Sequence, residues 1–500
     1  MTCPTTRRRN VFLVLLFAIL LMSSAAYAQI GVFQSQRDIG HVLHPGNAIF
    51  NTAKNSYTVS GSGENMWFGA ADFHFIWKKA SGDMAISADI NFVGSKGNNH
   101  RKAALLFRQT LNADSVYADV ALHGDGLTSL QYRDRTGADT HEVETATSAP
   151  QRVRIEKRGS YTYVFVSDKS GVLAFSGSAM RLELTGDFYV GLGVCSHDKD
   201  VSETAIFSNV EIEPLNAATD KPILWSTLET VKIASTDRLV AYTAPEHFEA
   251  PNWTRDGASL LINRDGTMHS FTLGREASPV SISTSPQNHV NNDHGLSPDG
   301  SMLAISDQSL DGKSRIYVLP SSGGTPRQIT PYGPSYWHGW SPDGKTLAFT
   351  GQRDGEFDIY TIPVAGGKET RLTTAKGLDD GPEYSPDGTT IYFNSERSGR
   401  MQIWSMAADG SNQTQVIDEP GNDWFPHVSP DGKWMIYLAY RPGVTGHPGG
   451  QDVELRLMSI ADRKIKTLAT LYGGQGTINV PSWSPDSTRV AFVSYAELPR

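Results

Sequence analysis

Apolar and polar residues alternate in short runs along the first part of the chain. Between residues 29 and 213 such runs, for example "DMAISADINF", "SVYADVAL" and "YTYVFVSD", are separated by Gly, Asn and Asp. A period of two residues places alternate side chains on opposite faces of a strand, and no helical period competes with it. The pattern predicts an antiparallel β-sandwich over residues 29–213, followed by a short polar linker over 214–221.

A different pattern governs residues 222–500, where a four-residue turn phrase recurs. The phrases begin at Thr254, Ser297, Ser341, Ser385, Ser429 and Ser484. Their successive spacings of 43, 44, 44, 44 and 55 residues, with four apolar runs in each unit, are typical of β-propeller blades. Six phrases predict six blades. Because the last unit is short of strands, we expect residues 224–234 to pair with the end of the chain and close the ring.

Both halves resemble known families. The turn phrase, preceded in four units by Pro, resembles the TolB-like (WD40-like) β-propellers, in which P-x-W-S-P-D-G opens each unit. The order of "FIWKKASGDMAISADINFVG", "AALLFRQ" and "RVRIEKRGSYTYVFVSD" resembles the concanavalin A-like, laminin-G-like sandwiches. The first resemblance implies the propeller fold, and the second implies either glycan binding or a spacer. The expected fold class is therefore all-β, a six-bladed propeller preceded by a sandwich.

The first 28 residues have the pattern of an export signal. Three arginines precede an apolar run at residues 11–22, and Ala26 and Ala28 fit an A-x-A cleavage site. We expect cleavage after Ala28, a periplasmic or extracellular location, and no membrane insertion of the mature chain, since a span needs about 20 apolar residues. Cys195 then remains alone and predicts a protein without an internal disulfide. A formal net charge of −9 disfavours nucleic acid and suits cations or neutral sugars.

Candidate functional residues lie where the repeat departs from its own rule. Three residues before the turn phrase, four units carry Pro, whereas two neighbouring units carry His294 and His338. The segments that lead into the inner strands converge at one mouth of the ring, together with a long loop of the fifth unit that contains His447. The candidate ligand-binding or catalytic residues at this mouth are His247, Glu249, Asn291, Asn292, Asp293, His294, Trp337, His338, Asp379, Asp380, Glu383, Asp423, Trp424, His427 and His447.

These residues also have structural interpretations. A single buried histidine is usually a satisfied core residue, and tryptophans at these positions could pack between blades. Several histidines that replace one another around a ring favour a shared site instead. His294, His338 and His427 could together bind one divalent metal ion, because imidazole and carboxylate groups suit such ions. No other cofactor is expected, since the sequence contains no phosphate-binding loop or dinucleotide fingerprint.

The polar mouth with interleaved aromatic residues predicts a glycan or oligosaccharide partner. Oligogalacturonate lyases are propellers with a metal at the channel mouth, and the resemblance to them is at the level of the fold alone. If the protein is an enzyme, we expect a polysaccharide or oligosaccharide lyase or hydrolase, with or without the assistance of a metal ion. The alternative is a non-catalytic periplasmic scaffold whose propeller face docks another protein, as in TolB-type translocation systems.

Overall fold

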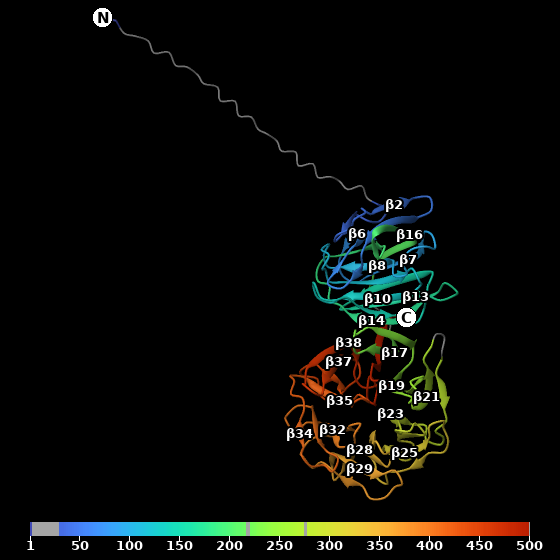
Figure 1. Cartoon of the computed structure of the whole chain (residues 1–500), viewed down its shortest axis with the longest axis vertical. Helices are drawn as coiled ribbons and strands as arrows, with labels where there is room; N and C mark the ends of the chain where they lie inside the picture. The colour runs from blue at the N-terminus through green and yellow to red at the C-terminus, as the bar shows by residue number, and fades with distance from the viewer. Residues whose placement is uncertain (3–29, 217–220, 275–277, 500) are drawn as a thin grey trace.

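The computed structural model describes residues 1–2, 30–216, 221–274 and 278–499. The predicted export signal and its cleavage site lie outside these residues, apart from the first two. Every regular element within them is a β-strand, so the all-β prediction is confirmed (Figure 1). None of the described segments forms a helix that could span a membrane. Cys195 is buried and free.

Two sheets make up the N-terminal part of the molecule. The seven-stranded sheet has the order β14 (Leu173–Arg181), β13 (Tyr161–Ser167), β12 (Arg152–Arg158), β7 (Met84–Phe92), β16 (Asp198–Pro214), β3 (Ser56–Gly63) and β2 (Asn47–Asn51). The ten-stranded sheet has the order β1 (Ser35–Ile39), β6 (Phe73–Ala80), β15 (Phe188–Cys195), β8 (Lys102–Arg108), β9 (Tyr117–His123), β10 (Thr128–Arg133), β11 (His141–Glu144), β18 (Arg238–Ala244), β17 (Ile223–Lys232) and β39 (Arg489–Leu498). A small hairpin, β4 (Met66–Trp67) with β5 (Ala70–Ala71), is separate from both.

The two sheets share one hydrophobic core. Alternate residues of β7, such as Ile86 and Ile90, contribute to it from one sheet, and Leu105, Val120 and Leu192 contribute from the other. The intervening residues of β8 and β9, such as Leu106 and Ala121, belong to a second hydrophobic cluster, so these central strands are buried on both faces. The likeness of this region to concanavalin A-like domains stays a prediction.

The C-terminal part contains five four-stranded blades. In chain order these are β19 (Phe248–Trp253), β20 (Ser259–Arg264), β21 (Thr267–Thr272) and β22 (Val280–Ile282); β23 (Val290–Leu296), β24 (Met302–Asp307), β25 (Arg315–Pro320) and β26 (Arg327–Gln328); β27 (Ser335–Trp340), β28 (Thr346–Arg353), β29 (Glu356–Pro363) and β30 (Thr370–Arg371); β31 (Asp379–Tyr384), β32 (Thr390–Ser395), β33 (Gln402–Ala407) and β34 (Thr414–Gln415); and β35 (Asn422–Val428), β36 (Trp434–Tyr440), β37 (Gln451–Ser459) and β38 (Ile465–Gly473).

The prediction of six blades is wrong, because the sixth repeat does not form a four-stranded sheet of its own. The segment before its turn phrase contributes only an isolated bridge between Trp483 and Val490. The next strand, β39, pairs instead with β17, and β17 pairs with β18. Strand β18 then runs parallel to β11, so these three strands belong to the ten-stranded sheet of the N-terminal part.

The predicted closure of the ring is confirmed. Strand β17 pairs with β39 in antiparallel register from Ile223–Leu498 to Lys232–Arg489. The start and the end of the propeller sequence are therefore neighbours, and their hydrogen-bonding edges are not left open. Figure 1 shows β17 at the boundary between the N-terminal part and the blades.

A buried ion pair joins the closing strands. Arg238 of β18 donates two hydrogen bonds of 2.8 Å to the carboxylate of Glu229 of β17. The hydroxyl of Ser494 of β39 donates to the same carboxylate, and Arg238 also donates to the carbonyl of Ala179 in β14 at 3.3 Å. The two charged side chains are 1% and 0% exposed. This pair therefore links the two ends of the propeller to the N-terminal sheets.

Replacing Glu229 by Gln should destabilise the protein by about 3–5 kcal/mol, because Arg238 keeps its charge in a buried place without a charged partner. Urea unfolding of the full chain, followed by tryptophan fluorescence, measures the loss. The control is Asp418→Asn, which removes the carboxylate from the exposed ion pair with Arg400 and should cost less than about 1 kcal/mol. Equal losses in the two variants would contradict a central role for the buried pair.

Candidate functional site

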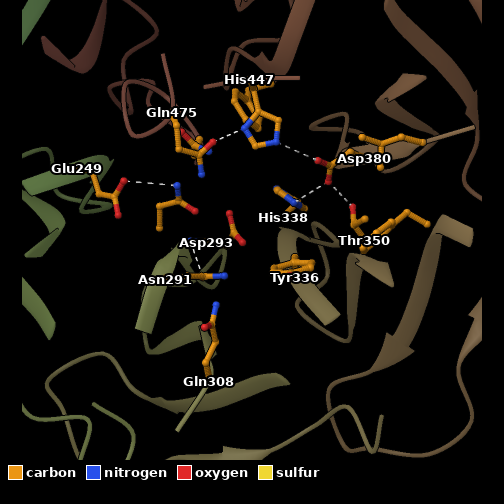
Figure 2. A pocket seen from close by; sticks show the side chains of 15 residues that line it. Glu249, Asn291, Asp293, Gln308, Tyr336, His338, Thr350, Asp380, His447 and Gln475 are labelled. Atoms are coloured by element: carbon orange, nitrogen blue, oxygen red, sulfur yellow. Dashed lines mark hydrogen bonds and ion pairs between the residues drawn. The ribbon is translucent and has the colours of Figure 1, made fainter. Parts of the chain in front are cut away.

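A cavity of about 560 Å³ opens where the first strands of the blades begin. Every blade contributes to it, as does the segment between β38 and β39, residues 474–488, here called the closing segment. Figure 2 shows the side chains arranged around a common space. The lining residues are Glu249, Asn291, Asn292, Asp293, Gln308, Tyr336, His338, Thr350, Phe357, Leu378, Asp380, Phe425, His447, Gln475 and Asn479. The predicted convergence of the inner-strand entry segments is thus observed.

Irregular backbone aims these side chains into the cavity. The inner strand of each blade is its first strand, namely β19, β23, β27, β31 or β35, and its pairing with the second strand shifts register near the lining residues. The shifts lie between Glu249 and Asn252, Val290 and His294, Trp337 and Gly339, Asp380 and Glu383, and Trp424 and His427. A β-bulge of this kind turns a side chain away from the regular alternation. In three blades the residue before the repeated Pro is also left-handed, with φ of 57° at Ala250, 61° at Gly381 and 56° at Phe425.

A polar residue that recurs in the second strand holds each bulge of the next blade. The position is occupied by Asn263, Ser306, Thr350 and Asn394, which are 43, 44 and 44 residues apart. Asn263 donates to the carbonyl oxygens of Val290 and Asn291 at 2.8 and 2.7 Å. Ser306 accepts from the N–H of Trp337 at 2.8 Å, and Thr350 donates to the carboxylate of Asp380 at 2.7 Å. Asn394 accepts from the N–H of Phe425 at 3.0 Å, so neighbouring blades fix the cavity wall together.

Asp380 and His338 form the charged pair of the cavity. His338 Nε2 lies 3.2 Å from Asp380 Oδ1, which also accepts hydrogen bonds from Thr350 and from the N–H of Gly381. Burial opposes ionisation of Asp380, but the hydrogen bond and charge of His338 and the other partners hold its pKa at about 2. Burial also lowers the pKa of His338, yet the carboxylates of Asp293 and Asp380 raise it above its usual value. Both shifts favour the charged forms of the two side chains.

Two further carboxyl groups face the same cavity. Burial raises the pKa of Asp293 to about 7, and the charge of Asp380 adds to this effect while His338 opposes it. Burial likewise raises the pKa of Glu249 to about 7, with a further contribution from Asp293. The amide of Asn292 contacts Glu249 at 3.5 Å. Both groups therefore exchange protons in the pH range in which general acid–base chemistry operates.

The part of the cavity wall near His447 is built from the loop between β36 and β37 and from the closing segment after β38. His447 Nδ1 is hydrogen-bonded to Gln475 Oε1, and its Nε2 lies 4.0 Å from Asp380 Oδ2. The imidazole packs edge-on against Trp424, with ring centroids 4.4 Å apart, and against Phe425 at 5.2 Å. His447 is thus fixed by aromatic packing on one side and by an amide on the other.

This wall is anchored to the N-terminal part. Asp452, which follows the loop of His447 at the start of β37, accepts a hydrogen bond from the hydroxyl of Tyr161 in β13. Arg181 of β14 and Arg441 of the loop itself lie 3.5 and 3.1 Å from the same carboxylate. The long loop of the fifth blade is therefore tied at its base to the N-terminal sheets.

Seven of the fifteen candidate residues line the cavity. They are Glu249, Asn291, Asn292, Asp293, His338, Asp380 and His447. The remaining eight are placed elsewhere, namely His247, His294, Trp337, Asp379, Glu383, Asp423, Trp424 and His427.

His294 and His338 occupy the same repeat position but have different surroundings. In blade three the register shift lies between Trp337 and Gly339, so His338 is the extra, unpaired residue and turns into the cavity. In blade two the shift ends at His294, which resumes pairing opposite Ile305 and points into the protein. Its imidazole is fully buried, and burial lowers its pKa to about 4. Of the two histidines that replace Pro, only His338 lines the cavity, and its role in binding a ligand stays a prediction.

Three other candidates, His427, Glu383 and Asp379, are paired with protein groups outside the cavity. His427 Nδ1 contacts Glu383 at 2.5 Å, and its Nε2 lies 2.6 Å from the carbonyl oxygen of Ile478. Asp379 is paired with Arg397 at 2.8 Å and is 1% exposed. These side chains connect neighbouring strands and loops, and none of them lines the cavity.

The remaining four candidates are packed outside it. Trp337 and Trp424 are 1% and 0% exposed and belong to hydrophobic clusters, as their structural interpretation predicts. Asp423 is buried, and burial together with the charge of Glu419 raises its pKa to about 7. His247 is exposed and stacks on Tyr495 with a centroid distance of 5.8 Å.

The structure does not bring the proposed metal ligands together. Of His294, His338 and His427, only His338 lines the cavity. Among the residues that the structure describes, no three His, Cys, Asp or Glu side chains are grouped so that they could hold a metal ion.

Eight lining residues were absent from the candidate set. They are Gln308, Tyr336, Thr350, Phe357, Leu378, Phe425, Gln475 and Asn479. Gln308, Thr350 and Phe357 come from the second and third strands and their connections, whereas the departures from the repeat that marked the candidates lie mainly on the inner strands. The recurrence of a polar residue at the position of Thr350 was a usable signal. Leu378 and Gln475 carry no such signal, since neither interrupts a repeated position.

Five blades around a polar cavity define a β-propeller protein. The model of the TolB β-propeller domain matches residues 338–456. An uncharacterised protein from Agrobacterium fabrum (strain C58) is 48% identical over 270 residues, which are 54% of this chain and 92% of the relative. A solved structure from Agrobacterium tumefaciens, whose protein carries the provisional name TolB, is 48% identical with a TM-score of 0.54 and is matched over 99% of its length by 55% of this chain. The chain therefore belongs to the TolB-like β-propeller family.

Replacing Asp293 by Asn should lower the pKa of His338, because the Asp293 carboxylate favours the imidazolium form. NMR titration of the imidazole signals measures this value, with His338 assigned from the signal that is lost in His338→Gln. Asp423→Asn is the matched control, since it makes the same change in a buried carboxyl group outside the cavity. An unchanged His338 titration in Asp293→Asn would contradict the coupling.

Proposed function

We propose that this protein is an exported glycan-binding protein whose propeller cavity takes the end of an oligosaccharide. The main support for this proposal is the set of side chains that line the cavity. Amide side chains, which both donate and accept hydrogen bonds, suit sugar hydroxyl groups, and aromatic rings suit the apolar face of a sugar ring. The amides are Asn291, Asn292, Gln308, Gln475 and Asn479, and the rings are Tyr336, Phe357 and Phe425.

The size and position of the cavity support this function. A volume of about 560 Å³ lies within the range of about 300–1,000 Å³ that is usual for small-molecule sites. The cavity opens at the mouth of the ring, so the remainder of a longer chain could extend into solvent. We further propose that the N-terminal sheets form a concanavalin A-like module that binds the same glycan or spaces the propeller from a surface.

Cleavage of the bound glycan is a second candidate function, favoured by the two carboxyl groups with pKa values near 7. Asp293 and Glu249 could each donate or accept a proton at neutral pH, as a hydrolase or a lyase requires. Mass spectrometry of a retained glycan after incubation separates the two reactions. Hydrolysis adds the mass of one water, whereas elimination leaves the total mass unchanged and produces an unsaturated sugar.

Tyr336→Ala should weaken glycan binding roughly tenfold, because the variant loses an aromatic surface worth about 1–1.5 kcal/mol. The mature full-length protein is first applied to a broad glycan array, and the dissociation constant of a retained glycan is then measured by calorimetry. The control is Tyr332→Ala, which removes an exposed tyrosine four residues earlier that does not line the cavity.

Equal affinities of the two tyrosine variants would place the glycan outside this cavity. Retention of no glycan by the wild-type protein would overturn the proposed function. Docking of another protein on the propeller face, as in a TolB-type scaffold, would then be the better account of this chain.

A further inference from the structure

The charges around the cavity are unevenly compensated. The titratable side chains that face it are Glu249 of β19, Asp293 of β23, His338 of β27, Asp380 of β31 and His447 of the loop after β36. Both histidines lie beside Asp380, at 3.2 and 4.0 Å. No Lys or Arg is found among the described residues that line the cavity. The two imidazole groups of the site therefore lie within 4.0 Å of the same carboxyl group, that of Asp380.

Asp293 and Glu249 have no histidine, lysine or arginine of the described chain within ion-pair distance, although the charge of His338 also acts on Asp293. Neither forms an ion pair with another residue of the described ranges, and Asp293 is only 5% exposed. The side-chain contact of Glu249 with Asn292, at 3.5 Å, is at the long limit of a hydrogen bond. A buried carboxylate without a cation is unfavourable, and a cationic ligand group placed between these two side chains would remove that cost.

Aromatic rings complete a surface that suits a cation. Tyr336, Phe357 and Phe425 line the same cavity. Within the described part of the chain, no Lys or Arg side chain stacks on any of these three rings, although Arg353 lies over the neighbouring Tyr332 and Tyr360. A ring face attracts a positive charge within about 6 Å of its centroid. The cavity thus offers two carboxyl groups without an ion pair, beside aromatic rings over which no Lys or Arg of the described chain lies.

We propose that the cavity selects a sugar that bears a free, protonated amine, with Asp293 and Glu249 as the residues that recognise the ammonium group. The proposal rests on the glycan-binding function proposed above and assigns its ligand class. It disfavours uronic acids, because their carboxylates would face Glu249 and Asp293. Of the two candidate cleavage reactions it therefore favours hydrolysis, since elimination needs the carboxylate of a uronic acid beside the proton that is removed. N-acetylated sugars keep the ring and hydroxyl groups but lose the charge, so they are the natural comparison.

The test compares free amino sugars with their N-acetylated forms and with the parent hexoses. Glucosamine, galactosamine and mannosamine are each titrated into the mature full-length protein, and the imidazole NMR signals of His338 and His447 report occupancy. Tetrasaccharides of β-1,4-linked glucosamine, N-acetylglucosamine and glucose are then compared by calorimetry. We expect the amine to bind at least tenfold tighter than its neutral counterparts, and its affinity alone to fall with added salt.

Variants of the two carboxyl residues test whether the preference for the amine arises in the cavity. Asp293→Asn and Glu249→Gln should each reduce the preference for the amine about tenfold, as expected from the loss of a charge-assisted contact of about 1.4 kcal/mol. Asp423→Asn, a buried carboxyl group away from the cavity, should leave it unchanged. Thermal unfolding of each variant confirms that the fold is retained before affinities are compared.

The outcomes separate this inference from the proposed function. Equal binding of charged and neutral sugars overturns the amine preference and leaves glycan binding intact. The absence of any response to the amines overturns the inference, and if the glycan array is also empty the proposed function fails with it. A metal ion that remains bound in stoichiometric amount, or an amine affinity that rises after treatment with a chelator, would also overturn the inference, because the metal would then be the cation that these carboxylates bind.

Discussion

The cavity depends on the hydrogen bonds that the second strands of blades one to four make to the inner strand of the next blade. Bulged and left-handed residues are intrinsically unfavourable, and they persist only where neighbouring structure fixes them. Asn263, Ser306, Thr350 and Asn394 do so by bonding the irregular backbone or its side chains. The inner strands of blades two to five are therefore each held, at the cavity, by the blade that precedes them.

The continuity of the ten-stranded sheet gives the N-terminal part a role in this arrangement. Strands β17, β18 and β39 close the propeller and at the same time extend the sheet that contains β11. The Glu229–Arg238 pair secures that junction, and the contact of Tyr161 with Asp452 reaches the loop that carries His447. The cavity wall at His447 consequently depends on residues of both parts, so the two regions that the sequence separates so clearly are not mechanically independent.

The fold was largely predictable because it depends on periodic features. Alternation of apolar residues indicates strands, and turn phrases 44 residues apart indicate blades. The closure by residues 224–234 followed from counting strands. The number of blades was wrong because a turn phrase marks a turn and cannot show which sheet the following strand joins. At Ser484 that strand pairs with β17, and the sheet continues into the N-terminal part.

The site was less predictable, and the two histidines at equivalent repeat positions show the reason. Alternate residues of a strand point in opposite directions. A bulge that ends one residue earlier or later therefore decides whether a given side chain faces the cavity or the core. His338 is the bulged residue and pairs with Asp380, whereas His294 is the first residue to resume pairing and is buried. Departures of the sequence from its repeat therefore indicate which segments contribute to the cavity. The register of each bulge, which is set by hydrogen bonds from the neighbouring blade, decides which of their side chains a ligand can reach.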